Sequence, residues 1–447
     1  MTLHYSRIVR AAAALVVASF VAHNPAQATT IERVVSPGGI EAWLVREPSV
    51  PLIALDFAFK GGADQDPDGK PGVGYLTSAL LDDGAGDLNS VAFQRLLQEY
   101  AVEMSFSTGR NHVLGSVRVL KEWSDQGFDL LRLALNVPRF DADALERARA
   151  QVITGLRRET TSPNDIASRT WWKTAFPGHP YGRPTNGTLE SVPQIAVDDL
   201  KAFARRVFAR DTLKVVAVGD IDAAALGKVL DRVFGALPAK AELNSVAPVT
   251  MQAMGRRIVV DLDVPQAVLA LGGVGLARKD PDFMTAYVVN HILGGGAFSS
   301  RLYTEVREKR GLAYGVYSYL MPLDHAALVM AGTATSGDKA GEALSIIESE
   351  MHRLANEGPT VAELAKAKAY LKGSYALRFD TSTKIASQLL QIQLDDLGID
   401  YINRRNQLID AVTIEDAKRV AKRLFSADFL VTVVGRPKGV TSKDPGG

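Results

Sequence analysis

Cysteine is absent from the 447 residues of this chain. The sequence therefore excludes disulfide bonds, thiolate-bound metal sites and a cysteine nucleophile. An excess of either charge sign is also lacking, because 51 Lys and Arg residues stand against 50 Asp and Glu residues. Without a clustered basic surface there is no electrostatic basis for binding nucleic acid. Long apolar runs are missing beyond the N-terminus, so we expect no membrane anchor in the mature protein.

The N-terminal residues have the organisation of a secretory signal peptide. One histidine and two arginines precede the apolar run Ala11–Ala22, and Ala26 and Ala28 form an A-x-A pattern. This arrangement predicts a signal peptide over residues 1–28, with cleavage after Ala28. We expect the mature protein to be exported. The form of the signal is typical of proteins sent to the bacterial periplasm.

The two halves of the mature chain repeat one another. The segments 197–219 and 414–435 share a layout in which matching residues, such as Phe208 and Phe425, lie 217 positions apart. Each segment has helical apolar spacing, a short polar break and an apolar run that ends in glycine. Three further pairs of segments match in the same order along the chain, among them 144–155 with 363–373. A duplication of one unit accounts for this order.

The duplication predicts the domain organisation. Between the halves, residues 238–255 are polar, contain two prolines and lack periodicity, as a linker does. We therefore expect an N-terminal domain over 29–237, a C-terminal domain over 256–437 and a disordered tail over 438–447. The fold class is α+β, with a largely antiparallel sheet in each domain and helices on one face of it.

Common catalytic patterns are missing from the mature chain. No two of its histidines lie three or four residues apart, the spacings that place two imidazoles on one helix face. A G-x-S-x-G motif is also absent, so a serine nucleophile has no support. His179, in the segment HPYG, is interpreted as a structural loop residue. The histidines that remain after cleavage are His112, His179, His291, His325 and His352.

Four segments together carry a resemblance to a known family. They are GKPGVGYLTSALLDDGAG (69–86), HPYGRPTNGT (179–188), VVAVGDID (215–222) and GGGAFSSRLYTEVREKRGLAYGVYS (294–318). This set, with the duplication, resembles the pitrilysin/insulinase-type zinc peptidases, in particular the branch that includes mitochondrial processing peptidase and its bacterial relatives. The resemblance covers nearly the whole mature chain. It implies two homologous domains that form half of a clamshell.

The zinc-binding residues of that family are missing here. The family binds zinc through an inverted H-x-x-E-H helix and a glutamate far downstream. The resemblance places the two imidazole positions at Tyr75 and Ala79, and the general base at Ser78. The downstream glutamate would fall near Gly155 or Leu156. We expect no metal in this chain, and zinc in a partner subunit.

An arginine and a tyrosine of the second domain match another family feature. In the family, these residues lie seven positions apart and reach a substrate bound at the other domain's zinc. Arg307 and Tyr314 have this spacing within REKRGLAY. A guanidinium and a phenol suit donation to peptide carbonyls and to a developing oxyanion. The neighbouring Arg301, Arg310 and two further tyrosines of this segment are interpreted as structural.

The resemblance thus implies the zinc-less subunit of a heterodimeric peptidase, inactive alone. Arg307 and Tyr314 would act on peptides held by a homologous zinc-bearing partner. Family members bind extended peptides by strand addition, and the candidate edge here is Ser105–Val119. Two alternatives remain, a non-proteolytic scaffold or assembly protein and a peptide-binding protein acting alone. A neighbouring gene that encodes H-x-x-E-H would favour the heterodimer.

Overall fold

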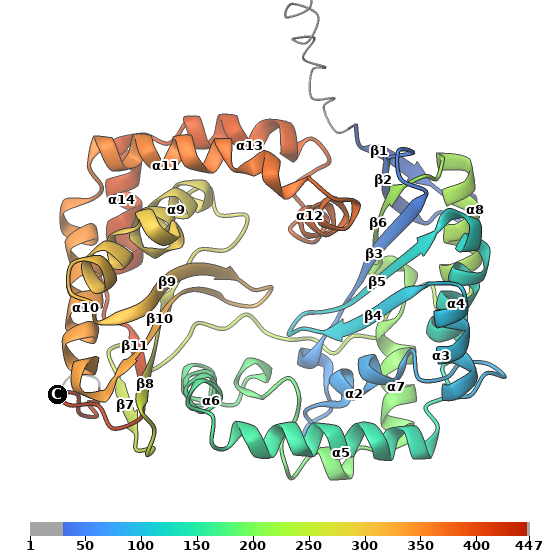
Figure 1. The fold of residues 1–447 in the computed structure, drawn as a ribbon, viewed down its shortest axis with the longest axis horizontal. Helices are drawn as coiled ribbons and strands as arrows, with labels where there is room; N and C mark the ends of the chain where they lie inside the picture. The colour runs from blue at the N-terminus through green and yellow to red at the C-terminus, as the bar shows by residue number, and fades with distance from the viewer. Residues whose placement is uncertain (1–29, 445–447) are drawn as a thin grey trace, which may run out of the picture.

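A computed structural model describes residues 30–444, and the predicted signal peptide lies outside this range. Within it the chain forms one sheet of six strands and one of five, each accompanied by helices (Figure 1). No helix in the described part of the chain combines the length and apolar character that a membrane span requires.

The first sheet has the strand order β1-β2-β6-β3-β5-β4. All of its neighbouring strands are antiparallel except the parallel pair β2 and β6. The strands are β1 (Glu32–Val35), β2 (Glu41–Arg46), β3 (Leu52–Lys60), β4 (Glu103–Thr108), β5 (His112–Leu120) and β6 (Lys214–Gly219). The helices of this half are α2 (Val73–Leu80), α3 (Ser90–Glu99), α4 (Ser124–Asn136), α5 (Ala142–Glu159), α6 (Pro163–Ala175), α7 (Val197–Val207) and α8 (Ala223–Phe234).

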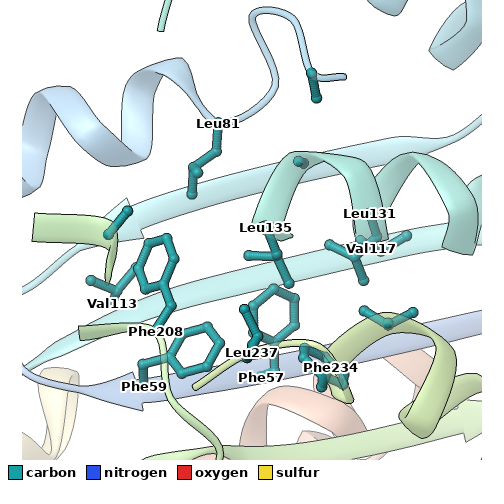
Figure 2. Packing of buried hydrophobic residues seen from close by; sticks show 14 of the residues in the cluster. Phe57, Phe59, Leu81, Val113, Val117, Leu131, Leu135, Phe208, Phe234 and Leu237 are labelled. Carbon is teal, nitrogen blue, oxygen red and sulfur yellow. The ribbon is translucent and has the colours of Figure 1, made fainter. Parts of the chain in front are cut away.

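One face of this sheet forms the main core of the first half. Alternate residues of β3, including Phe57 and Phe59, point from the sheet toward the helices, as the period of two along a strand requires. Figure 2 shows these rings among side chains of α4 and α8. The Phe59 ring stacks on Phe208 at 5.0 Å between centroids, and Phe57 meets Phe234 edge to face at 5.3 Å. Aromatic packing therefore joins the sheet to its helical layer.

The second half repeats this plan with one strand fewer. Its order is β7-β11-β8-β10-β9, and its parallel pair is β7 and β11. The strands are β7 (Arg257–Val260), β8 (Gln266–Val274), β9 (Ala313–Pro322), β10 (Ala327–Ser336) and β11 (Leu430–Val434). The helices are α9 (Phe283–Asn290), α10 (Ala340–Glu357), α11 (Val361–Gly373), α12 (Ser382–Leu394), α13 (Tyr401–Asp410) and α14 (Ile414–Phe425).

The predicted α+β class, with two similar and largely antiparallel units, is confirmed. The matched sequence segments occupy matched elements, since α7 leads into β6 and α14 leads into β11. Helix α7 buries Leu200, Phe203, Ala204 and Val207, and α14 buries the residues 217 positions later. This spacing of three and four residues places one apolar stripe of each helix against its sheet.

Each sheet is also covered on its second face by a helix from the other half. Helix α12, from the second half, packs its Leu389 and Ala386 on Trp43, Val216 and neighbouring side chains of the first sheet. Coverage of both faces explains why β6 is almost entirely buried and lacks polar alternation.

Helix α6 makes the reciprocal contact on the second sheet. The buried Trp171 donates its indole N–H to the carbonyl of Leu430 at 3.2 Å. Gly272 of β8 gives the indole room, because a Cβ atom there would lie 2.0 Å from the Trp171 ring. The two halves therefore exchange one helix each, and Figure 1 shows α6 and α12 between the sheets.

Turns and linker residues add to the contact between the halves. The turn between β9 and β10 lies against the turn between β4 and β5, where the Asp324 backbone N–H donates to the Asn111 side chain at 3.3 Å. The His325 backbone N–H donates to the hydroxyl of Tyr181, which follows α6, at 3.0 Å. That hydroxyl in turn donates to Asn111 at 2.9 Å. Helix and strand are absent between α8 and β7, the region of the predicted linker, although Val249 donates its backbone N–H to the carbonyl of His325.

A disordered tail was predicted over residues 438–447, and the structure differs from this prediction in the part that it describes, residues 438–444. Val440 is buried in the second core. Lys443 and Arg257 exchange two backbone hydrogen bonds, at 2.7 and 2.8 Å, and Asp444 forms an ion pair with Arg256. Composition alone misses these contacts because they depend on the position of β7, far away in the sequence.

Candidate functional site

Helix α2, which carries the degenerate zinc positions, begins at a glycine and a buried carboxylate. Gly72 has a φ of 102°, a conformation that glycine adopts without steric cost. The Asp66 carboxylate accepts hydrogen bonds from the backbone N–H groups of Gly72 and Gly74, both at 2.7 Å. Burial raises the pKa of Asp66 to about 7, although these two hydrogen bonds oppose the shift. Asp66 thereby fixes the start of α2.

Three positions that the resemblance singled out lie together in one hollow. Tyr75 and Ala79, one turn apart on α2, are exposed and line a hollow of about 360 Å³ together with Gly155 of α5. Leu156, the other candidate for the downstream ligand position, is buried in the core of the first half. Of the two candidates for the downstream ligand position, only Gly155 therefore lines this hollow.

Ser78, at the position of the general base, does not line this hollow. Its side chain is 3% exposed, and its hydroxyl lies 2.5 Å from that of Thr108 on β4. The Thr108 hydroxyl also donates to the carbonyl of Gly74. Ser78 thus joins α2 to the edge of the first sheet through hydrogen bonds that leave no free base.

The hollow does not fit a zinc ion. Two carboxylates line it, but Glu159 accepts hydrogen bonds from Arg169 and Asn186, and Asp83 accepts one from Ser90. Zinc sites need three or four imidazole, thiolate or carboxylate ligands that converge on one point. Within residues 30–444, no three His, Asp or Glu side chains are grouped in a way that could hold a metal.

Arg307 and Tyr314 lie against each other in the second half. Arg307 belongs to the π-helical segment Tyr303–Glu308, which precedes a turn at Gly311 and strand β9. Its guanidinium carbon lies 4.4 Å from the centroid of the Tyr314 ring and 4.9 Å from that of Tyr303. Both distances are typical of cation–π contacts. Tyr314 is 84% exposed, so the pair presents a cation and a phenol on the surface.

A β-bulge in β9 places Tyr314 in this position. Val316 pairs with Thr333 and Ala313 pairs with Thr335, so β9 has one residue more than β10 between the two pairs. Bulges redirect side chains and occur often beside active sites. The Thr333 hydroxyl stabilises the bulge by donating to the carbonyl of Gly315 at 2.7 Å. Sequence analysis could not predict this bulge, because the threonine lies 18 residues from its acceptor.

Both sheets end in an edge strand that could pair with an extended peptide. In the first sheet one edge strand is β4, which contains the first part of the predicted segment Ser105–Val119, whereas β5 is its inner neighbour. In the second sheet one edge strand is β9, with exposed Tyr317 and Tyr319 rings stacked at 6.1 Å. An edge strand offers unpaired backbone groups to a peptide.

Other residues singled out in the sequence have structural partners. Arg301 forms a bidentate pair with Glu363, at 2.6 and 2.8 Å, and Arg310 pairs with Glu305. The His179 ring binds backbone groups of Tyr181 and of the linker, each at 3.1 Å. None of the three reaches the Arg307–Tyr314 pair through a described hydrogen bond.

Comparison with known proteins identifies similar families and folds. A family model described as the peptidase M16 inactive domain matches residues 194–371. An uncharacterized zinc protease of Streptomyces coelicolor is 27% identical over 419 residues, which cover 91% of this chain and 90% of the relative. A protein named non-peptidase homolog YmxG, from Helicobacter pylori, is 28% identical over 335 residues, or 74% of this chain and 77% of the relative.

A solved structure is similar over nearly the whole described chain. It is the crystal structure of a peptidase M16 inactive domain from Pseudomonas fluorescens, with a TM-score of 0.85 and 26% identity. The match covers 93% of this chain and 100% of that one. Family model, relatives and fold agree with the family that the four sequence segments resemble. These findings support an M16-type chain, of the pitrilysin/insulinase kind, that lacks the zinc-binding H-x-x-E-H sequence.

Proposed function

We propose that this chain is the zinc-less subunit of a heterodimeric M16 peptidase and is inactive alone. A homologous partner supplies H-x-x-E-H and zinc, and this chain supplies Arg307 and Tyr314 to the peptide held there. The predicted signal peptide would direct the assembly to the periplasm. Peptides are the substrates, degraded or processed by the pair of subunits.

The observation that carries this proposal is the geometry of Arg307 and Tyr314. A bulge turns Tyr314 outward, and the guanidinium of Arg307 lies over its ring. The Tyr314 hydroxyl makes no hydrogen bond to another residue of the described chain, so its donor is available to a substrate. Packing does not require such an arrangement, because an 84% exposed ring buries little apolar surface.

The missing metal ligands support the division of labour between two chains. The positions that the resemblance assigns to metal ligands carry Tyr75, Ala79 and Gly155, which line one hollow. None of these residues has an imidazole or a carboxylate. Two alternative functions, a non-proteolytic scaffold and a peptide-binding protein acting alone, share this feature. The relative named non-peptidase homolog YmxG keeps these alternatives open to test.

Co-expression with an H-x-x-E-H relative encoded in the same genome tests the proposal. We expect a stable complex that cleaves peptides, whereas neither chain alone does so. In this complex, Tyr314→Phe should lower kcat by about 10²–10³, the usual effect of removing one donor to an oxyanion. Arg307→Ala should raise KM as well as lower kcat, because a guanidinium that holds peptide carbonyls also acts in the ground state.

Lys309→Ala is the matched control for these variants. Lys309 lies in the same charged segment, but its ammonium pairs with Glu305 on the surface at 2.7 Å. We expect its loss to change neither kcat nor KM. Equal behaviour of all three variants, or failure to associate with any H-x-x-E-H relative, would favour the scaffold or the peptide-binding alternative.

A further inference from the structure

The second half contains a cavity of about 670 Å³ between α9, α11, α12, α13 and the edge strand β9. Its place corresponds to the degenerate zinc hollow of the first half, since α9 follows β8 as α2 follows β3. Tyr287 and His291, four residues apart, line the cavity as Tyr75 and Ala79 line the smaller hollow. The duplicated position has therefore become a larger pocket in the second half.

A buried arginine without an acidic partner lies in the wall of this cavity. Arg405 is 4% exposed, and no carboxylate of residues 30–444 forms an ion pair with it. Its guanidinium carbon lies 3.9 Å from the centroid of the Tyr375 ring, and its N–H groups donate to the Leu371 carbonyl at 3.1 Å and weakly to the Tyr287 hydroxyl at 3.5 Å. Buried cations are normally paired, because removal from water is costly.

The rest of the lining adds positive charge. Arg278 is balanced by Asp395, at 2.9 Å, but exposed Arg378 has no ion pair within the described chain. Burial lowers the pKa of His291, whose ring stacks on Tyr370 at 5.1 Å, and so favours the neutral form of the imidazole. One carboxylate thus faces three guanidiniums across a pocket with aromatic walls.

We propose that this cavity binds a carboxylate attached to an apolar group. The carboxylate would pair with Arg378 and Arg405, since guanidinium matches a carboxylate in charge and geometry. Rings such as Tyr370 and Tyr375 would pack on the apolar group. The C-terminal residue of a peptide has this chemistry, and so does a free aromatic acid. The site is independent of the proposed partner subunit.

Binding to the mature chain alone, without any partner, tests this proposal. The probes are an alanine hexapeptide ending in phenylalanine with a free carboxyl group, the same peptide as its C-terminal amide, and 3-phenylpropionate. By calorimetry we expect the acid to bind roughly tenfold or more tightly than the amide, a difference typical of one charge-assisted contact. Equal affinity of acid and amide would overturn the proposal. Tighter binding of 3-phenylpropionate than of the peptide acid would assign the site to small acids.

Variants connect the binding to the two arginines. Arg378→Gln changes an exposed side chain and should weaken the acid about fivefold or more without affecting the amide. Arg405→Lys keeps the buried charge but removes the planar donor pair, and its fold is checked by thermal melting. The control is Arg404→Gln, on the same helix, because neither Arg404 nor its ion-pair partner Asp400 lines the cavity. If Arg378→Gln binds the acid as the unmodified chain does, the proposal is wrong.

Discussion

A Cβ atom added at Gly155 would meet no other atom within 4 Å. This position on α5 therefore accepts a side chain, and glutamate has a better helix propensity than glycine there. Tyr75 and Ala79 face the same hollow from α2. The three positions thus share one hollow, and none of them carries an imidazole or a carboxylate.

We predict that three substitutions restore zinc binding. Tyr75→His with Ala79→His supplies two imidazoles and should bind zinc weakly. Addition of Gly155→Glu completes three protein ligands and should tighten binding roughly tenfold or more. Competition with a chromogenic zinc chelator measures both affinities.

The control for this prediction places the same carboxylate elsewhere. Gly373, at the end of α11, also has open space around it, so Gly373→Glu on the double-histidine background tests for non-specific effects. Equal zinc affinity of this control and the Gly155→Glu variant would show that the hollow does not position the ligands.

At this scale the sequence offers candidate site residues, whose roles stay predictions, but it does not specify their surroundings. The seven-residue spacing singled out Arg307 and Tyr314, and the structure adds that the guanidinium lies against the Tyr314 ring. The bulge was not predictable, because it depends on a hydroxyl of another strand. Arg405 carried no local signal either, since its cavity collects residues from 278 to 405.

At the scale of elements, the start of α11 is tied to Arg301, which lies just before the π-helical segment. The Glu363 carboxylate accepts from the Thr360 backbone N–H at 2.8 Å, which completes a capping box, and also receives the Arg301 guanidinium. Burial alone would raise the pKa of Glu363, but the hydrogen bonds from Arg301 and Thr360 outweigh it and lower the pKa to about 2. One side chain therefore serves two elements.

We predict that Glu363→Gln destabilises the protein in a pH-dependent way. The pKa of Glu363 is lower in the folded state than its unfolded value of 4.5. The ionised carboxylate therefore stabilises the folded protein above pH 4.5, and this stabilisation is lost as the pH falls toward 2. The variant should lose about 1–3 kcal/mol at pH 7, as for a hydrogen bond to a charged group, and less in acid. Denaturant unfolding at several pH values measures the difference.

Glu415→Gln is the control for that experiment. Glu415 also lies in the first turn of a helix, α14, but it is exposed and forms no ion pair within the described chain. Its replacement should have a small effect. A Glu363→Gln difference that is constant from pH 7 to pH 2 would contradict the assigned role of the carboxylate.

Element order was largely predictable, whereas element placement was not. The periodicity of α7 and α14 specifies which stripe of each helix is buried. Apolar periodicity does not specify which sheet the buried face of a helix will cover, so the exchange of α6 and α12 was not predicted. Trp171 shows the reason, because its acceptor Leu430 lies 259 residues away.

At the scale of the whole molecule, the exchange makes the halves depend on each other. Without α12, the first sheet would expose Trp43, Val216 and the apolar side chains around them. Without α6, the second sheet would expose Leu328, Met330 and their neighbours. Exposed apolar surfaces of this kind lead to association or partial unfolding.

We predict that residues 30–250 and 251–444, expressed separately, do not form stable monomers. Mixed and refolded together, they should form a complex that melts cooperatively, which size exclusion and calorimetry would detect. An intact chain cleaved within the linker after folding is the control and should stay associated. Two halves that each melt cooperatively as monomers would refute the mutual dependence.

The exchange also bears on how such a chain could arise. The contacts of α6 and α12 are those that two copies of a half-length chain would make if each gave a helix to the other's sheet. That arrangement is a swapped homodimer, a common route to symmetric association. A linker between the copies turns their encounter into an intramolecular event with a high effective concentration. Fusion then removes the requirement that both copies stay alike, so one can lose its metal ligands while the other acquires a pocket.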